Sequence, residues 1–290
     1  MRLLRYGPRG HERPAMLDAD DRIRDLSAII DDITPESLTP PQLRALADIP
    51  AESLPIVESD QRIGVPVKGI GKFIAIGLNY ADHALESGLE PPSEPIFFTK
   101  AISCLNGPND PVMLPRDATK ADWEVELGII IGTTARYVDG ADALDHIAGY
   151  VLVNDVSERA FQKELGSQWD KGKGCDTFGP CGPWLVTPDE VGDPQNLDMH
   201  LDVNGVARQR GNTRTMIFPV REIIAYLSRF LTLYPGDLVI TGTPPGVGEG
   251  QRPDPIFLKA GDTMTLGIER LGAQHQSVVA WRHLGAEVLA

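Results

Sequence analysis

Short apolar segments that follow one another without helices between them constrain the fold of this chain most. Patterns typical of buried strands occur at 72–79, 96–100, 124–131, 149–154, 184–186, 199–203, 237–241 and 264–268. The clearest helical pattern runs from Val220 to Leu231, where Ile223, Ile224, Leu227 and Leu231 share one face. The 29 glycines and 24 prolines favour turns. A doubly wound sheet needs regular alternating helices, so we predict an α+β, mainly β fold.

The first 66 residues differ from the rest in the pattern of their apolar, acidic and proline residues. Apolar residues from Leu3 to Tyr6, and on either side of an acidic turn at 18–21, predict short strands. Thr39 followed by two prolines predicts a helix start, and the proline-rich stretch 50–64 predicts a connector. We therefore expect a small N-terminal domain with its connector at 1–66 and a larger domain at 67–290.

The charge and cysteine content exclude several classes of protein. A formal net charge of −14 repels phosphates and anionic headgroups, so we expect neither nucleic acid nor membrane as a partner. The 3 widely spaced cysteines argue against a disulfide framework and a thiolate zinc site. The first residues lack the apolar segment of a signal peptide, and no apolar run approaches the ~20 residues of a membrane span. We expect a cytoplasmic protein.

Two glutamates flank a valine at the start of an apolar strand. Residues i and i+2 of a strand share a face, so Glu124 and Glu126 would lie side by side, opposite Val125 and Leu127. Carboxylates so placed repel each other unless a cation or a proton compensates. A hard cation such as Mg²⁺ prefers such oxygen ligands. The spacing alone is more typical of an edge strand with a solvated acidic face.

Another acidic residue, Asp155, follows the strand at 149–154. Asp155 stands where carboxylates serve either as metal ligands or as helix caps, and the sequence leaves both open. Arg159 and Gln162 lie three residues apart, so a helical turn would place both donors on one side.

His83 and Glu86 have a spacing that lets them meet on a helix. The carboxylate would then orient the imidazole and raise its basicity, as a general base acting on water requires. An ordinary surface pair has the same spacing.

Two glycine-rich segments complete the set. Lys173 lies between glycines and can turn inward to meet an anion, although a mobile surface loop fits as well. Thr243 lies in Thr241-Gly-Thr-Pro-Pro-Gly-Val-Gly, directly after a strand, where backbone N–H groups and hydroxyls can bind a carboxylate. The segment lacks the pattern of a phosphate loop, so no nucleotide is implied.

Taken in order, five segments resemble the fumarylacetoacetate hydrolase family over roughly residues 70–270. They are Gly77-Leu-Asn-Tyr-Ala-Asp-His83-Ala-Leu-Glu86, Glu124-Val-Glu126-Leu-Gly, Asn154-Asp155-Val-Ser-Glu-Arg159, Gly172-Lys173-Gly-Cys-Asp-Thr-Phe-Gly-Pro and Thr241-Gly-Thr243-Pro-Pro-Gly-Val-Gly. The resemblance implies a mixed β-roll fold with a variable N-terminal domain, usually as a homodimer. The family's Gly-Lys-Ser-Phe is replaced by Gly172-Lys173-Gly174-Cys175, which changes one wall of the pocket.

The resemblance also implies the roles of individual residues. Glu124, Glu126 and Asp155 would hold Mg²⁺ or Mn²⁺, with Ca²⁺ as an occupant in crystals. His83, Glu86 and Lys173 would be catalytic, and Arg159, Gln162 and Thr243 would bind substrate.

The implied substrate is a 2-oxo or 2,4-diketo acid. The N-terminal extension, the Gly-Cys-Asp-Thr-Phe-Gly-Pro variant and Arg210 to Phe218 resemble a subgroup that hydrolyses 2,4-diketo-3-deoxy sugar acids, such as the rhamnonate or fuconate derivative, to pyruvate and a hydroxy acid. An acylpyruvase and an oxaloacetate decarboxylase are the alternatives within the family. A non-hydrolytic 2-oxoacid isomerase or binding protein is the alternative of another class.

Overall fold

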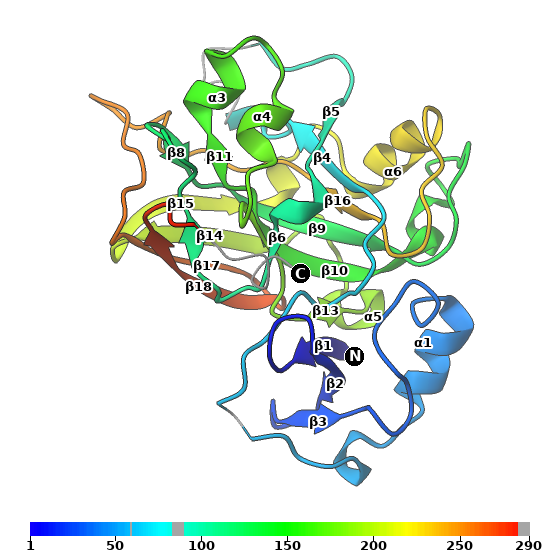
Figure 1. The fold of residues 1–290 in the computed structure, drawn as a ribbon. Coiled ribbons are helices and arrows are strands. Elements are labelled where there is room, and N and C mark those ends of the chain that lie inside the picture. The colour runs from blue at the N-terminus through cyan, green and yellow to red at the C-terminus, as the bar shows by residue number, and fades with distance from the viewer. Residues whose placement is uncertain (59, 83–89, 284–290) are drawn as a thin grey trace.

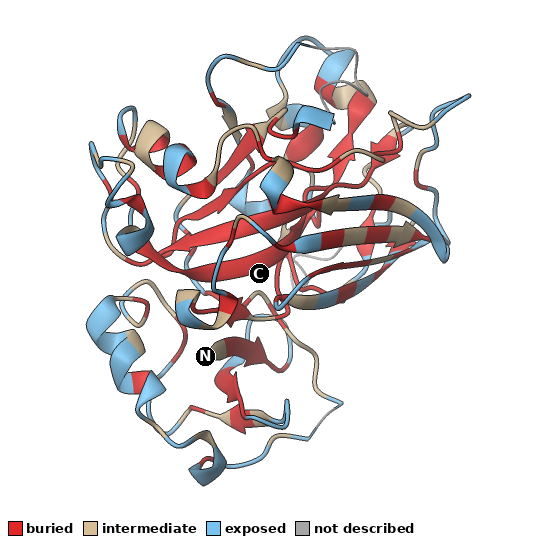
Figure 2. Ribbon diagram, turned by 180° about the vertical axis from the view of Figure 1, so that it is seen from behind, coloured by how far each residue is buried: buried red, intermediate tan, exposed pale blue. Residues whose placement is uncertain are grey.

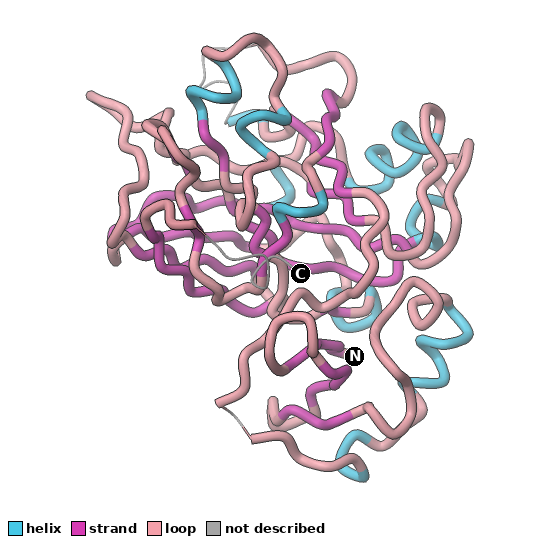
Figure 3. The backbone as a smooth tube through the Cα atoms, viewed as in Figure 1, coloured by secondary structure: helices cyan, strands magenta, loops and turns pink. Residues whose placement is uncertain are grey.

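Two β-sheets with short helices around them form the protein (Figures 1 and 3). The computed structural model describes residues 1–58, 60–82 and 90–283. The nine-stranded sheet has the spatial order β3 (Ile23–Asp25), β2 (Arg13–Leu17), β1 (Arg2–Tyr6), β13 (Leu185–Val186), β10 (Ile147–Asn154), β9 (Val125–Ile131), β16 (Leu238–Ile240), β4 (Phe73–Gly77) and β5 (Ile96–Thr99). The five-stranded sheet has the order β15 (Val206–Asn212), β14 (Asp198–Val203), β17 (Thr263–Ile268), β18 (Gly272–Val279) and β7 (Val112–Met113).

Smaller elements connect the two sheets. Two short pairs join β8 (Ala121–Asp122) to β11 (Ser157–Glu158) and β6 (Leu105–Asn106) to β12 (Gly179–Pro180). The α-helices within the described ranges are α1 (Pro40–Ala47), α3 (Arg159–Lys163), α4 (Asp170–Lys173), α5 (Pro188–Val191) and α6 (Val220–Ser228). Most strand pairs are antiparallel, but β16 pairs in parallel with β4, β18 with β7, and β12 with β6. The prediction of an α+β, mainly β architecture with mixed sheets is confirmed.

The core lies between the sheets, and it explains the composition of their strands. Every residue of β9 and β10 is buried, which is why these strands are apolar without alternation (Figure 2). Strand β14 instead alternates buried with partly or fully exposed residues, as expected for a sheet with one solvated face. Glycine 128 permits the close packing of β9 on β10, because a Cβ there would approach Val151 Cγ2 to 2.6 Å.

The N-terminal strands continue the larger sheet. Strand β1 pairs with β13 through Arg2 and Val186, so the first three strands extend the sheet at one edge. The N-terminal segment lies against one end of the remaining structure (Figure 1). Its buried side chains Leu3 and Met16 belong to the same apolar cluster as β9 and β10. The predicted strands and the predicted helix start at Thr39 are confirmed, while the boundary at residue 66 stays a prediction.

The helix expected over 220–231 is α6, and it buries Ile223, Ile224 and Leu227 as predicted. It ends earlier, at Ser228, whose side chain donates to Ala225 O and accepts from Val138 N. Within the described ranges no helix is long and apolar enough to cross a membrane.

Candidate metal centre and substrate pocket

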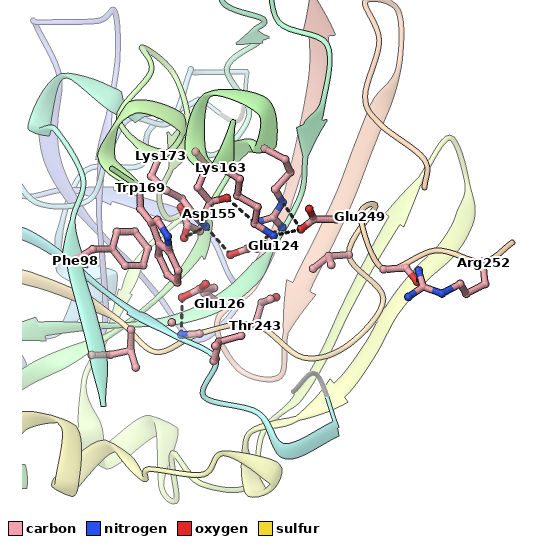
Figure 4. Close-up of a pocket in the computed structure, with 18 residues that line it drawn as sticks. Phe98, Glu124, Glu126, Asp155, Lys163, Trp169, Lys173, Thr243, Glu249 and Arg252 are labelled. Carbon is pink, nitrogen blue, oxygen red and sulfur yellow. Dashed lines mark hydrogen bonds and ion pairs between the residues drawn. The ribbon is translucent and has the colours of Figure 1, made fainter. Parts of the chain in front are cut away.

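Three carboxylates from two neighbouring strands converge at one edge of the larger sheet (Figure 4). Glu124 precedes β9, Glu126 lies within it, and Asp155 follows β10. The antiparallel register, which pairs Val125 with Asn154, brings the start of β9 beside the end of β10. One oxygen from each carboxylate lies within 4.8 Å of the others, and all three residues are buried. The solvated-face interpretation of Glu124 and Glu126 is therefore wrong.

Glu126 is the most isolated of the three carboxylates. Its Oε2 accepts a hydrogen bond of 2.7 Å from the backbone N–H of Gly242, and no ion pair reaches it from the described residues. Burial raises the pKa of Glu126 well above its ordinary value, and the charges of Asp155 and Glu124 raise it further. A buried carboxylate beside two others fits a hard divalent cation, which would offset this repulsion and accept oxygen ligands. The residues present therefore fit the implied metal.

Lysines 173 and 100 neutralise part of the acidic cluster. Lys173 Nζ donates to Glu124 Oε2 at 2.8 Å and to Asp155 Oδ2 at 2.6 Å. Burial would lower the pKa of Lys173, but Asp155 and Glu124 outweigh it and hold the pKa above its ordinary value. Lys100 Nζ donates to Asp155 Oδ1 at 2.5 Å and to the backbone carbonyls of Val156 and Lys173. Both oxygens of Asp155 are thus held by buried ammonium groups.

Sequence reasoning missed Lys100. Its signal is a lysine at the end of the apolar strand 96–100, but many strands end in a solvated lysine. Only the tertiary structure shows that its side chain is inaccessible to solvent.

Helix α3 presents Arg159 and Gln162 toward the carboxylates. Arg159 Nη2 donates to Glu124 Oε1 at 2.6 Å, and its Nη1 contacts Gln162 Oε1 at 3.2 Å. Its Nε donates to Asp122 Oδ2 at 2.9 Å. Burial would lower the pKa of Arg159, yet Asp122 and Glu124 raise it, so the guanidinium keeps its charge. The predicted placement of both donors on one side is confirmed.

Asp122 is a second residue that sequence reasoning left without a role. Besides Arg159, it accepts the backbone N–H groups of Gly248 at 2.6 Å and Glu249 at 3.0 Å. It therefore ties Arg159 to the segment that follows Thr243. The cap interpretation of Asp155 is wrong, since the N-cap of α3 is Glu158, whose side chain accepts from Ala160 N.

Lys173 occupies the last position of α4 and not a loop. The adjacent Gly172 serves close packing more than flexibility, because a Cβ there would lie 2.3 Å from Glu158 O and 2.7 Å from Gln162 Cβ. The glycine thus lets α4 lie directly on α3, which points Lys173 inward.

A cavity of about 430 Å³ opens over the carboxylates. Its apolar wall includes Phe98 and Trp169, whose rings meet edge to face at 5.3 Å (Figure 4). Arg252 lies far from the carboxylates in the same view. The predicted residues that line the cavity are Glu124, Glu126, Asp155, Arg159, Gln162, Lys173 and Thr243. His83 and Glu86 lie outside the described residues.

Thr243 lines the cavity from the loop after β16. Its hydroxyl donates to Val125 O at 2.9 Å and accepts from Gln209 Nε2 at 2.8 Å. Gln209 is a third residue that sequence reasoning missed, because it comes from the other sheet.

The chain is similar to a known family and to proteins of known structure. Residues 72–279 match the fumarylacetoacetate (FAA) hydrolase C-terminal family. A relative from Sphingomonas sp., a 2,4-didehydro-3-deoxy-L-rhamnonate hydrolase, is 62% identical over 99% of both chains. The structure of a fumarylacetoacetate hydrolase from Exiguobacterium antarcticum superposes with a TM-score of 0.86 at 36% identity, covering 97% of this chain and 100% of that one.

A further solved structure bears on the metal. Maleylpyruvate hydrolase from Sphingobium sp., in complex with manganese(II) ion and pyruvate, has a TM-score of 0.81 at 32% identity, and the match covers 97% of this chain and 100% of that one. The resemblance inferred from five short segments is thus confirmed over the whole catalytic region. This chain belongs to the fumarylacetoacetate hydrolase family.

Proposed function

We propose that this chain is a metal-dependent hydrolase that cleaves the C3–C4 bond of a 2,4-diketo-3-deoxy sugar acid, the L-rhamnonate derivative being the preferred substrate. The products would be pyruvate and lactate. The observation that carries the proposal is the group of three buried carboxylates, Glu124, Glu126 and Asp155, at the base of a cavity. The likeness to a rhamnonate-derivative hydrolase over nearly the full chain supports the choice of sugar acid.

The metal would be Mg²⁺ or Mn²⁺, held by the three carboxylates. When bound, such a cation supplies Lewis-acid stabilisation of the negative charge that develops on the 2-oxo group. The manganese and pyruvate complex of the maleylpyruvate hydrolase supports a divalent ion in this role.

The chain's own cations would orient the substrate. Lys173 and Arg159 hold their charge at the cavity, where they can attract the substrate carboxylate and stabilise an oxyanion. A positioned donor of this kind contributes ~3–4 kcal/mol to transition-state stabilisation. Phe98 and Trp169 give the cavity an apolar wall.

His83, oriented by Glu86, would remove a proton from the water that attacks the C4 carbonyl. The C3–C4 bond then breaks with its electron pair on C3, which takes up a proton to give the methyl group of pyruvate. The former C4 carbonyl becomes the carboxylate of lactate.

The His83→Ala variant tests water activation. Removal of the general base should lower kcat for the diketo acid by ~10²–10⁴-fold while leaving Mn²⁺ affinity unchanged. Stopped-flow loss of diketone absorbance and calorimetric titration of Mn²⁺ measure the two quantities. A near wild-type hydrolysis rate would exclude His83 as the base.

A substrate panel separates the family alternatives. The wild-type enzyme with Mg²⁺ or Mn²⁺ should turn over the diketo-rhamnonate with a higher kcat/KM than an acylpyruvate or oxaloacetate. Faster release of CO₂ from oxaloacetate would favour the decarboxylase. Conversion of the diketo acid to an isomer without pyruvate would favour the isomerase. A homodimer and a cytoplasmic location remain predictions, tested by light scattering and by cell fractionation.

A further inference from the structure

Gln209 is a buried polar side chain that reaches the metal-ligand segment from the other sheet. It lies on β15, the edge strand of the five-stranded sheet, and is fully buried. Its Oε1 accepts from Val125 N at 3.0 Å, and its Nε2 donates to Thr243 Oγ1 at 2.8 Å and to Pro244 O at 2.7 Å. Within the described ranges, the hydrogen bonds of its side chain therefore lie on the two segments that form the candidate site.

The chemistry of the partners fixes the orientation of this amide. Val125 N–H can only donate and Pro244 O can only accept, so Oε1 must face the first and Nε2 the second. Since Nε2 also supplies the hydrogen to Thr243 Oγ1, the threonine hydroxyl directs its own hydrogen to Val125 O. The result is a closed ring of three hydrogen bonds around the peptide groups of Val125.

The ring of hydrogen bonds lies beside the first residues of β9, on the side where β16 does not yet pair with β9. Strand β16 pairs with β9 only from Gly128 onward, which leaves the β16 side of Val125 without a ladder partner. In an antiparallel strand the N–H and C=O of one residue point to the same side. Gln209 and Thr243 satisfy both groups of Val125 in place of a strand.

Val125 is the residue between two of the proposed metal ligands. A change in its backbone direction would move the Cα atoms of Glu124 and Glu126 in opposite senses and alter the separation of their carboxylates. On the other side of β9, Val125 faces Asn154, whose Oδ1 accepts from Glu124 N at 3.2 Å. The start of β9 is therefore held on both sides by side-chain amides.

Two glycines let the Thr243 loop approach β15 closely enough for this ring. A Cβ on Gly211 would lie 2.4 Å from Pro244 Cβ. A Cβ on Gly246 would lie 2.0 Å from Arg208 O, directly beside Gln209. The close approach has steric room only because both residues lack a side chain.

We infer that Gln209 is a positioning residue for the metal centre, acting through Val125 and Thr243 to set the separation of the Glu124 and Glu126 carboxylates. The inference rests on the metal site of the proposed function. It also gives Thr243 a second task, since its hydroxyl is engaged within the protein and holds the ligand segment in place.

The Gln209→Leu and Thr243→Val variants test the inference by calorimetric titration of the full-length chain with Mn²⁺. Each should weaken Mn²⁺ binding by ~10- to 100-fold, the range for residues that orient metal ligands. Thr243→Ser keeps the hydroxyl and should bind Mn²⁺ like the wild type. Because both residues act in one ring, the double variant Gln209→Leu/Thr243→Val should lose little more affinity than either single variant.

Gln195→Leu is the matched control. The side chain of Gln195 also bridges two backbone groups, because it accepts from Val220 N at 2.6 Å and donates to Thr213 O at 3.2 Å. Among the residues that the structure describes, it makes no hydrogen bond to the segments that carry the proposed metal ligands. Its replacement should lower the melting temperature and leave Mn²⁺ affinity unchanged.

The outcomes separate the two proposals. If the wild-type chain binds no Mn²⁺, the proposed metal centre is wrong and the inference falls with it. If the wild type binds and Gln209→Leu and Thr243→Val bind equally well, only the inference is overturned. Additive losses in the double variant would also overturn it. Should Gln209→Leu fail to fold, the contrast between Thr243→Val and Thr243→Ser decides alone.

Discussion

Glu126 is a buried carboxylate that, among the residues described, accepts a hydrogen bond from the backbone N–H of Gly242 alone. Its pKa is raised well above the ordinary value by burial, and in addition by Asp155 and Glu124. In the absence of metal, the ionised form of Glu126 therefore lowers the stability of the folded chain. A bound cation would stabilise this ionised form.

The Glu126→Gln variant should separate these effects. Glutamine keeps the acceptor for Gly242 N–H and removes the charge, so the metal-free variant should be at least as stable as the wild type in urea unfolding. Its affinity for Mg²⁺ should fall by at least ~100-fold, which is more than the usual effect of replacing a residue that only orients a metal ligand. Glu249 also lines the cavity but is only half-buried, so Glu249→Gln serves as control and should bind Mg²⁺ normally. Unchanged Mg²⁺ affinity in Glu126→Gln would remove Glu126 from the ligand set.

Individual residues differ in how far the sequence predicts them. Glu124 and Glu126 could be singled out, because two carboxylates beside an apolar run need a compensating cation wherever the strand is buried. Lys100, Asp122 and Gln209 carry no such local signal, since lysine, aspartate and glutamine are ordinary on surfaces. Their burial depends on which segments pack over them.

At the scale of elements, α3 and α4 bring Arg159 and Lys173 to the carboxylates through one close contact. The sequence suggested that the glycines around Lys173 give it freedom. In the structure Gly172 is buried against Glu158 and Gln162. Because Gly172 has no side chain, the two short helices α3 and α4 can pack directly against each other.

Gly172→Ala should therefore disturb both stability and catalysis. The new methyl group would meet backbone and side-chain atoms at 2.3–2.7 Å, so α4 must shift and carry Lys173 with it. We expect a loss of ~1–3 kcal/mol in the free energy of unfolding, as for other overpacked sites. A fall in kcat should accompany it, and urea unfolding and steady-state kinetics measure the two. Gly140→Ala, where a Cβ meets nothing within 4 Å, should change neither. A stable and fully active Gly172→Ala would contradict this account of the packing.

At the scale of the whole molecule, the candidate metal centre brings together segments that lie far apart in the sequence, from Glu124 to Gly242. Because a cation would bind only the folded chain, Mg²⁺ should raise the melting temperature. At a concentration of 100 times Kd the gain is ~2.7 kcal/mol, which corresponds to roughly 4–5 °C for a chain of this length. Thermal scans with Mg²⁺ and with a chelator measure the shift. A melting temperature independent of Mg²⁺ in the wild type would argue against the site.

The N-terminal strands share the apolar core with β9 and β10. We therefore expect the loss of an interaction in these strands to lower the stability of the whole molecule. Burial would raise the pKa of Asp18, but hydrogen bonds from Arg22, Arg24 and the backbone of Asp20 outweigh it and hold the pKa below its usual range. A lowered pKa stabilises the folded chain above about pH 4, the ordinary value for aspartate, and this contribution is lost as the pH falls further.

Asp18→Asn should accordingly unfold at lower urea concentration than the wild type at pH 7, with a difference that shrinks as the pH falls below 4. The exposed Asp20→Asn, in the same turn, should have little effect at either pH. A difference between Asp18→Asn and the wild type that stays constant with pH would show that the Asp18 charge is not the cause.

The sequence by itself determined the mainly β architecture, the positions of most strands and the placement of Glu124 and Glu126 on one face of a strand; Asp155 joined them only through the family resemblance. These properties follow from local patterns, namely side-chain periodicity, turn residues and the spacing of charges along one strand. The helix α6 and the N-terminal strands belong to the same class of property.

Only the tertiary structure decided what surrounds the carboxylates. The register of β9 on β10 places Asp155 beside Glu124. Lys100, which follows β5, and Lys173 of α4 reach Asp155, and Gln209 of β15 reaches the backbone of Val125. Such contacts join residues far apart in the chain, and no local pattern specifies them. The physical reason is that burial, which strengthens the hydrogen bonds and ion pairs of these polar groups, is a property of the packed molecule and not of any segment.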